Sequence, residues 1–216
     1  MSAADANRPN PEILNEEELA SISRSAVTRI FSTRTVIVTE GDKSDALYVI
    51  AEGRCRAFVS DESGREAILS DMGPGEYFGE VAMDEGPRSA SVITLEPTKL
   101  YVVTADRFRA FLAENPDFAF HFIRKLLHRI RGLTRNVSSL ALLDVYGRVA
   151  RLLTELAVEE GGRQVMPERM TQTEIASRVG CSREMVSRIF KDLVQGGYIS
   201  QEKDRIVVHR KPPARW

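Results

Sequence analysis

Residues 171–193 read TQTEIASRVGCSREMVSRIFKDL. Thr171 and Glu174 have the spacing of a capping box, which predicts the start of a helix. Gly180 predicts the end of that helix, because glycine readily takes the left-handed conformation that follows a helix. Ser182 then predicts the N-cap of a second helix. The stretch therefore predicts two short helices joined by a tight turn.

Small and branched side chains stand where two crossing helices need them. Ala176 allows the helices to approach closely, while Val186 and Ile189 fill the wedge between them. Cys181 is expected to pack inside the turn. A chance helical hairpin would share only a few of these features. The stretch is therefore interpreted as a helix-turn-helix, a motif that places its second helix in the major groove of DNA.

The second helix presents polar side chains near its N-terminus. Arginine can donate two hydrogen bonds to guanine, and glutamate can accept one from cytosine, so Arg183, Glu184 and Arg188 predict recognition of G·C pairs. Glu184 and Arg188 are also expected to pair with each other. A hairpin predicted at 198–208 forms a wing that contacts phosphate. The candidate DNA-contacting residues are Thr171, Gln172, Ser182, Arg183, Glu184, Ser187 and Arg188.

Charge and composition agree with a DNA-binding protein. Residues 1–145 carry 17 Lys and Arg against 22 Asp and Glu, a net charge of −5, whereas residues 146–216 carry 13 against 9, a net charge of +4. No apolar run approaches the ~18–20 residues that span a bilayer, and no secretory leader is predicted. Cys55 and Cys181 are too few for a disulfide framework or a four-ligand metal centre. We expect a cytoplasmic protein with no membrane partner and no bound metal.

Short β-rich runs separated by turns fill residues 35–103. The runs are TVIV, ALYVIA, RCRAFVS, REAILS, SASVIT and KLYVV. Closely spaced strands without intervening helical patterns predict an antiparallel β-roll. Cupin-type enzymes share such a roll, but they generally need histidine or carboxylate metal ligands there, and no histidine precedes His121. We therefore expect that the protein is not an enzyme.

A long helix is predicted after the roll, at 116–143, with Asn115 and Pro116 at its start. Its apolar residues recur at alternating spacings of three and four, as in the seam of a coiled coil. This seam favours a parallel homodimer, although a stripe this short could instead pack within its own domain. The stripe comprises Ile123, Leu126, Ile130, Leu133, Val137 and Leu140.

One segment inside the roll, FGEVAMDEGPRSA at 78–90, lacks a strand pattern. Gly79 permits a close approach of the backbone, Glu80 begins a short helical turn with free amide groups, and Arg88 brings a cation back to the same loop. With the Ser89 hydroxyl these groups could cradle a phosphate, while Glu80 suits a sugar hydroxyl. A cyclic nucleotide satisfies both demands. The alternative is a Glu80–Arg88 ion pair that only closes the loop.

The order of roll, loop, long helix and winged helix-turn-helix resembles the CRP/FNR family of bacterial regulators, in particular its cyclic AMP receptor branch. The motifs FGEVA…PRSA, LALLDVYGRVA and GCSREMVSRIFKDL carry the resemblance. It implies that the loop binds ribose and cyclic phosphate, that a central-helix residue contacts adenine, that the DNA half-site is similar to TGTGA, and that RNA polymerase is a partner. The implied ligand-contacting residues are Gly79, Glu80, Val81, Arg88, Ser89 and Thr134.

Two departures from that family leave the nucleotide open. Glu80 and Arg88 are eight positions apart, fewer than in most such loops. In the central helix, Leu133 and Thr134 stand where cyclic AMP receptors offer two polar residues, and only Thr134 can form a hydrogen bond. Cyclic AMP is the expected ligand. The alternative is the same DNA-binding role with cyclic di-GMP as the ligand, or with no nucleotide.

These predictions combine into an α+β fold. The expected parts of the chain are an N-terminal arm at 1–20, a cyclic nucleotide-binding β-roll at 21–115, a dimerisation helix at 116–143 and a winged helix-turn-helix at 144–216. The expected function is that of a homodimeric transcription regulator. Ligand binding would favour the hinge arrangement whose recognition helices fit a two-fold symmetric DNA site, with half-sites roughly 34 Å apart.

Overall fold

The computed structural model describes the backbone of residues 13–43, 45–84, 86–166, 170–202 and 205–213. The chain forms two compact units. The first comprises residues up to 59 together with 68–132, and the second comprises 60–67 together with 133–216, so the division falls within the long helix between Gly132 and Leu133.

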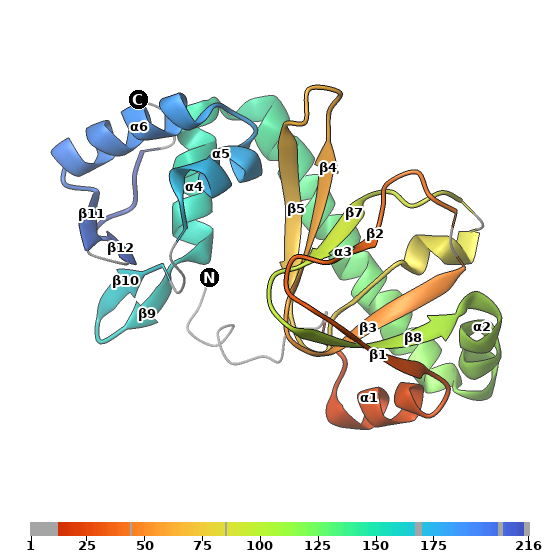
Figure 1. Ribbon diagram of the computed structural model, residues 1–216. Helices are drawn as coiled ribbons and strands as arrows, with labels where there is room; N and C mark the ends of the chain where they lie inside the picture. The colour runs from red at the N-terminus through yellow and green to blue at the C-terminus, as the bar shows by residue number, and fades with distance from the viewer. Residues whose placement is uncertain (1–12, 44, 85, 167–169, 203–204, 214–216) are drawn as a thin grey trace. The chain divides into compact units, whose positions relative to one another are not determined.

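The predicted β-roll is confirmed as two four-stranded sheets (Figure 1). In the first sheet the strand order is β1-β8-β3-β6, and in the second it is β2-β7-β4-β5. The pairings of β8 with β1 and β3, and of β7 with β2 and β4, are antiparallel. The strands are β1 (Val27–Phe31), β2 (Val36–Val38), β3 (Ala46–Glu52), β4 (Cys55–Ser60), β5 (Glu66–Met72), β6 (Tyr77–Phe78), β7 (Ser91–Thr94) and β8 (Thr98–Thr104).

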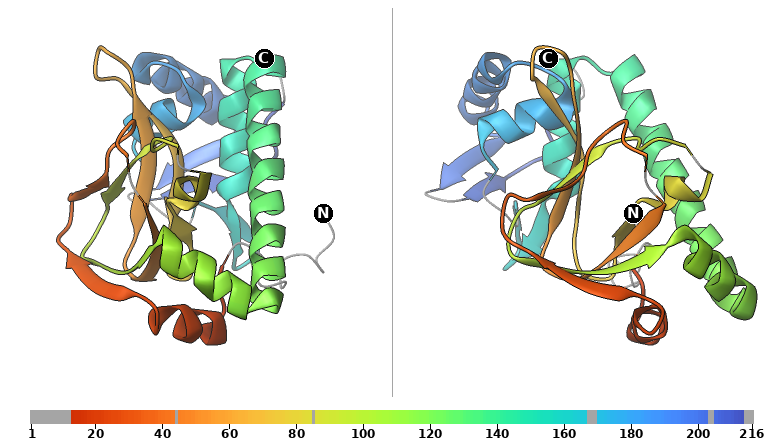
Figure 2. Two further views of the ribbon diagram at one scale, coloured as in Figure 1. Left: turned by 90° about the vertical axis from the view of Figure 1, so that its right-hand side faces the viewer. Right: turned by 45° about the vertical axis from the view of Figure 1, so that its right-hand side comes forward.

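An aromatic cluster joins the roll to the helices that follow it. Helix α2 (Ala105–Glu114) and the first half of α3 (Pro116–Leu142) lie against the roll (Figure 2). Phe108 is fully buried, and its ring meets that of Phe122 edge-on at 5.2 Å. Helix α3 begins at Pro116 as predicted. Thr104 precedes α2, and its side chain makes no capping hydrogen bond.

The N-terminal part of the roll contains elements that the sequence analysis missed. Residues 1–12 of the expected arm lie outside the described residues. The remainder enters α1 (Glu16–Ser23), which opens with a capping box between Asn15 and Glu18. Strand β1 was missed because four of its five side chains are exposed, so it has no alternation of apolar and polar residues.

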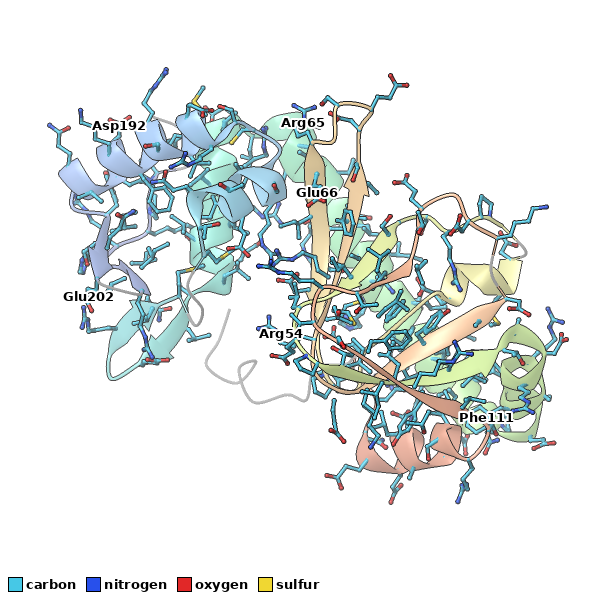
Figure 3. The ribbon with its side chains drawn as sticks, viewed as in Figure 1. Arg54, Arg65, Glu66, Phe111, Asp192 and Glu202 are labelled. Carbon is cyan, nitrogen blue, oxygen red and sulfur yellow. The ribbon has the colours of Figure 1, made fainter. Side chains whose placement is uncertain are left out.

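The second unit contains the predicted winged helix-turn-helix (Figure 1). Its helices are α4 (Val145–Leu156), α5 (Gln172–Val179) and α6 (Arg183–Gln195). Strands β11 (Ile199–Glu202) and β12 (Arg205–Val208) pair as the predicted wing, and Figure 3 shows Asp192 on α6 and Glu202 on β11. Ile175, Val186 and Leu193 are fully buried together in the core of this unit.

The stretch after α4 contains two strands that the sequence analysis did not predict. It forms a hairpin of β9 (Val158–Glu160) and β10 (Arg163–Val165). Gly161 and Gly162 both have positive φ, at 59° and 77°. Two consecutive residues of this kind make the turn that matches the twist of a hairpin. Strand β10 also pairs with β12, so the hairpin extends the wing sheet.

Helix α3 carries an apolar stripe whose side chains are exposed. Ile130, Val137 and Leu140 are 56–65% exposed. The predicted stripe is wrong at one position, because Leu126 packs against the aromatic core of the roll, whereas Leu127 is 49% exposed. Among the described residues, no helix is long and apolar enough to cross a membrane.

Candidate nucleotide-binding and DNA-binding sites

The segment after β6 brings three of the predicted ligand-contacting residues together. Gly79 has a φ of +85°, and Glu80 begins a short 3₁₀ helix, η1 (Glu80–Asp84), as predicted. A Cβ atom added to Gly79 would lie 2.5 Å from Arg88 Nη1 and 2.8 Å from the Ala46 carbonyl oxygen. Only glycine therefore fits between the start of η1 and the Arg88 side chain.

Arg88 points into the roll. It is 4% exposed, its Nη1 donates to the Gly79 carbonyl oxygen at 3.1 Å, and its Nη2 donates to that of Ala46 at 2.8 Å. Its Cζ lies 5.6 Å from the centre of the Tyr48 ring. Burial lowers the pKa of Arg88, and Tyr48, Glu80 and Asp45 partly offset that effect. The two carbonyl oxygens orient the guanidinium, and its fixed positive charge suits an anionic ligand.

Glu80 forms an ion pair with a residue of the central helix. Arg129 Nη1 of α3 lies 3.1 Å from Glu80 Oε1, and the Glu80 side chain is only 15% exposed. The carboxylate is therefore held by α3 and does more than close its own loop. A carboxylate in this position can accept a hydrogen bond from a sugar hydroxyl. Arg129 was not predicted, because the pair spans 49 positions in the sequence.

The remaining ligand-contacting candidates are Val81, Ser89 and Thr134. Ser89 is exposed. The backbone of Val81 belongs to η1, but its side chain lies outside the described residues. Thr134 is an exposed residue of α3 in the second unit. The structure thus brings Gly79, Glu80 and Arg88 together, while the ligand-binding roles of all six candidates stay predictions.

The recognition helix presents the predicted base-contacting side chains to solvent. Arg183, Glu184, Ser187 and Arg188 are all exposed on α6. Hydrogen bonds from its own backbone N–H and from Ser182 lower the pKa of Glu184, so this group stays an ionised acceptor. The expected Glu184–Arg188 ion pair is wrong, since none forms between these two described side chains. Arg183 and Arg188 are both exposed and can therefore reach the major groove of DNA.

Two of the DNA-contacting candidates cap helices. The Thr171 hydroxyl accepts a hydrogen bond from the Glu174 N–H at 3.2 Å, and the Ser182 hydroxyl accepts one from the Met185 N–H at 3.2 Å. Gly180 ends α5 in the left-handed conformation, as predicted. These caps fix where α5 and α6 begin, and exposed N–H groups at helix N-termini are common phosphate contacts.

A groove beside the recognition helix adds residues that the sequence analysis did not single out. It holds about 540 Å³ and combines amide, hydroxyl and ammonium groups from α5, α6 and β11. Lys191 is exposed and lines this groove together with Gln172 and the wing residue Gln201. Such a row of polar and cationic groups can follow a phosphate backbone. The lining residues are Gln172, Ser187, Phe190, Lys191, Val194, Gln195 and Gln201.

A β-roll with a buried arginine, followed by a long helix and a winged helix-turn-helix, defines a ligand-responsive DNA-binding regulator. Residues 28–115 match the family model of the cyclic nucleotide-binding domain, and residues 147–212 match that of the Crp-like helix-turn-helix domain. The chain belongs to the CRP/FNR family of transcription regulators. It is therefore a dimeric DNA-binding regulator whose roll takes a nucleotide ligand.

Similar proteins cover most of the chain. The cAMP-activated global transcriptional regulator CRP of Pasteurella multocida is 35% identical, and the match covers 83% of this chain and 88% of that protein. A CRP-like cAMP-activated global transcriptional regulator of Mycobacterium tuberculosis is 32% identical, and the match covers 88% of this chain and 87% of that protein. The solved structure of the c-di-GMP-responsive regulator CLP of Xanthomonas campestris has a TM-score of 0.78 and 26% identity, covering 91% of this chain and 100% of that chain.

Proposed function

We propose that this regulator binds cyclic AMP in the roll and, in that state, binds a two-fold symmetric promoter site with TGTGA-like half-sites. The observation that carries the proposal is the inward-facing Arg88 next to Gly79 and Glu80. The guanidinium would bind the cyclic phosphate, and the Glu80 carboxylate would accept a hydrogen bond from the ribose hydroxyl. Relatives named as cAMP-activated, at 32–35% identity, support the choice of nucleotide.

The ion pair between Glu80 and Arg129 gives the ligand a route to the central helix. Arg129 lies on α3 and pairs with Glu80. A ribose hydroxyl that donates a hydrogen bond to Glu80 therefore changes the strength of this ion pair. A ligand shifts a conformational equilibrium only as far as its affinity differs between the two states. The Glu80 carboxylate contacts both the ligand and α3, so the ligand affinity can differ between two positions of α3. We further propose that the protein acts in the cytoplasm, recruits RNA polymerase and has no catalytic activity.

The second candidate keeps the DNA-binding role but replaces the ligand with cyclic di-GMP. It is favoured by the likeness to the c-di-GMP-responsive regulator and by the short spacing between Glu80 and Arg88. In this case the nucleotide could cause release from DNA instead of binding. The two candidates differ in which nucleotide the pure protein binds.

Calorimetric titration of the full-length dimer with cyclic AMP, cyclic GMP and cyclic di-GMP tests these assignments. We expect cyclic AMP to bind the wild type and to bind Arg88→Leu about 100-fold more weakly, the effect of truncating one partner of a buried charge pair. Arg109→Leu removes an exposed arginine of α2 and should bind as the wild type does. Equal affinity in Arg88→Leu contradicts the phosphate role of Arg88, and binding of cyclic di-GMP alone favours the second candidate.

A further inference from the structure

The junction between α3 and α4 is short and bonded on both sides. Helix α3 ends at Leu142, and Asp144 caps α4 by accepting a hydrogen bond from the Gly147 N–H at 2.7 Å. Only Leu143 and Asp144 lie between the two helices. All of these residues belong to the second unit. A two-residue link still allows rotation about its backbone bonds, so other contacts must set the angle between the helices.

Arg148 of α4 fixes one point of this junction. Its Nη1 donates to the Leu143 carbonyl oxygen at 3.0 Å, just beyond the end of α3. Its Nε donates to the Val179 carbonyl oxygen at 2.8 Å, at the end of α5. Arg148 therefore ties the end of α3 to the first helix of the helix-turn-helix. One fixed point does not define the direction of a helix.

Arg151 fixes a second point. Its Nη1 donates to the Arg135 carbonyl oxygen at 2.9 Å, and its Nε donates to Glu155 Oε1 at 2.8 Å, which orients the guanidinium. Arg148 and Arg151 lie three positions apart and hence on one face of α4. The two carbonyl groups that they hold lie eight positions apart, about 12 Å along a helix. Two points this far apart determine the direction of α3 relative to α4.

We propose that Arg151 is a positioning residue that couples the central helix to the DNA-binding unit. Its acceptor, Arg135, directly follows Thr134, the residue expected to contact the nucleotide base, and this step rests on the proposed function. A shift of Thr134 moves the Arg135 carbonyl group, and the Arg151 guanidinium transfers the shift to α4 and its helix-turn-helix. A lysine cannot replace it, because one ammonium lacks the fork that reaches the Arg135 carbonyl and Glu155 together.

Promoter affinity of Arg151→Met, measured with and without saturating nucleotide, tests this role. The variant keeps the aliphatic stem and loses both hydrogen bonds. We expect nucleotide affinity and dimer formation as in the wild type, while the ratio of the two DNA affinities falls at least about fivefold, the lower end of allosteric coupling. Arg109→Met on α2 removes an equal charge and should keep the wild-type ratio. An unchanged ratio in Arg151→Met overturns the proposal.

A second measurement judges Arg151 independently of the ligand. Without nucleotide, amide hydrogen exchange at residues 136–143 should be about fivefold faster in Arg151→Met, the effect of losing one hydrogen bond. Equal exchange rates overturn the proposal. If the wild type itself shows no nucleotide-dependent DNA affinity, the proposed function fails, and the exchange rates alone decide on Arg151.

Discussion

Gly79 shows how a single missing side chain makes room for the binding group. Its positive φ and the 2.5 Å between an added Cβ and Arg88 Nη1 leave no space for alanine. The Ala46 carbonyl oxygen, 2.8 Å from the same added Cβ, belongs to the backbone of β3 and cannot move away cheaply. Gly64 has a similar φ of +79°, but nothing lies within 4 Å of an added Cβ. Alanine substitutions at the two positions therefore distinguish the effect of backbone strain from that of the contact with Arg88 and Ala46.

We predict that Gly64→Ala loses about 1–2 kcal/mol of unfolding free energy, the cost of the left-handed conformation. Gly79→Ala should lose more, because its methyl group also clashes with the Ala46 carbonyl oxygen. Only Gly79→Ala should also lose nucleotide affinity, because its methyl group displaces the Arg88 guanidinium. Urea denaturation measures the first effect and calorimetry the second. Nucleotide affinity in Gly79→Ala equal to that in Gly64→Ala would show that the close approach has no role in binding.

Arg183 and Lys191 are predicted to contribute to DNA binding in different ways. Arg183→Ala should weaken binding to the specific site by about 1–3 kcal/mol and relax discrimination at one base pair. Lys191→Ala should weaken binding to specific and random DNA alike and lower the slope of log affinity against log salt by about 1. Fluorescence anisotropy at several salt concentrations measures both. An equal loss on both DNAs for Arg183→Ala would make it a phosphate contact.

Some residues of the sites were predictable from the sequence and others were not. Gly79, Glu80 and Arg88 share one short segment, so their residue types and spacing sufficed to associate them. Arg129 and Tyr48 reach the same place from α3 and β3. No local pattern indicates such contacts, because they depend on how distant elements pack. The groove residue Lys191 was missed for a similar reason, since the groove also takes residues from α5 and β11.

At the level of elements, local signals predicted the helix-turn-helix well. The bounds of α5 and α6 follow from Thr171, Gly180 and Ser182, each of which acts through its nearest neighbours. Strand β1 and the β9–β10 hairpin were missed, since their side chains are mostly exposed and pairing with other strands defines them. Helix α1 is anchored by Lys125, more than a hundred positions away.

A buried ion pair attaches α1 to α3. Lys125 Nζ lies 3.1 Å from Glu18 Oε2 and donates to the Ile13 carbonyl oxygen at 2.9 Å, and the Lys125 side chain is 7% exposed. Burial raises the pKa of Glu18, but the hydrogen bond from the Asn15 N–H and the Lys125 ammonium outweigh it, so the pKa is lowered. The stabilisation is thus present above the unfolded-state pKa of Glu18 and is lost as the pH falls through the folded-state value.

We predict that Lys125→Met costs about 3 kcal/mol of unfolding free energy at pH 7, because it leaves the Glu18 carboxylate buried without its cation. The deficit should shrink as the pH falls and Glu18 becomes protonated, because a neutral carboxyl group no longer needs the Lys125 cation. His121→Ala removes an exposed partner of the same carboxylate and should cost less than about 1 kcal/mol. Urea denaturation between pH 3 and 7 measures both variants. Similar costs at pH 7 would contradict the anchoring role of Lys125.

For the whole molecule, the apolar stripe of α3 is the expected dimer interface. Its exposed members Leu127, Ile130, Leu133, Val137 and Leu140 recur at spacings of three and four. This spacing suits a partner helix better than broad burial within one chain. Leu126 could not be assigned from the sequence, because a helix with two apolar faces does not reveal which face its own domain covers.

We predict that Val137→Glu weakens the dimer by at least about 100-fold, since two symmetry-related carboxylates would face each other in an apolar seam. Leu69→Glu places the same charge on an exposed aliphatic position of β5 and should leave the dimer intact. Sedimentation equilibrium measures the dissociation constants. A Val137→Glu protein that remains dimeric would place the interface elsewhere.

The most direct test of the account is the affinity for a duplex with two inverted TGTGA half-sites, measured by anisotropy at fixed salt with and without cyclic AMP. Salt must be fixed because counterion release changes affinity by itself. We predict at least about tenfold tighter binding with cyclic AMP, and no such response in Arg88→Leu. Equal affinity of the wild type with and without saturating cyclic AMP would contradict the claim that cyclic AMP in the roll controls DNA binding.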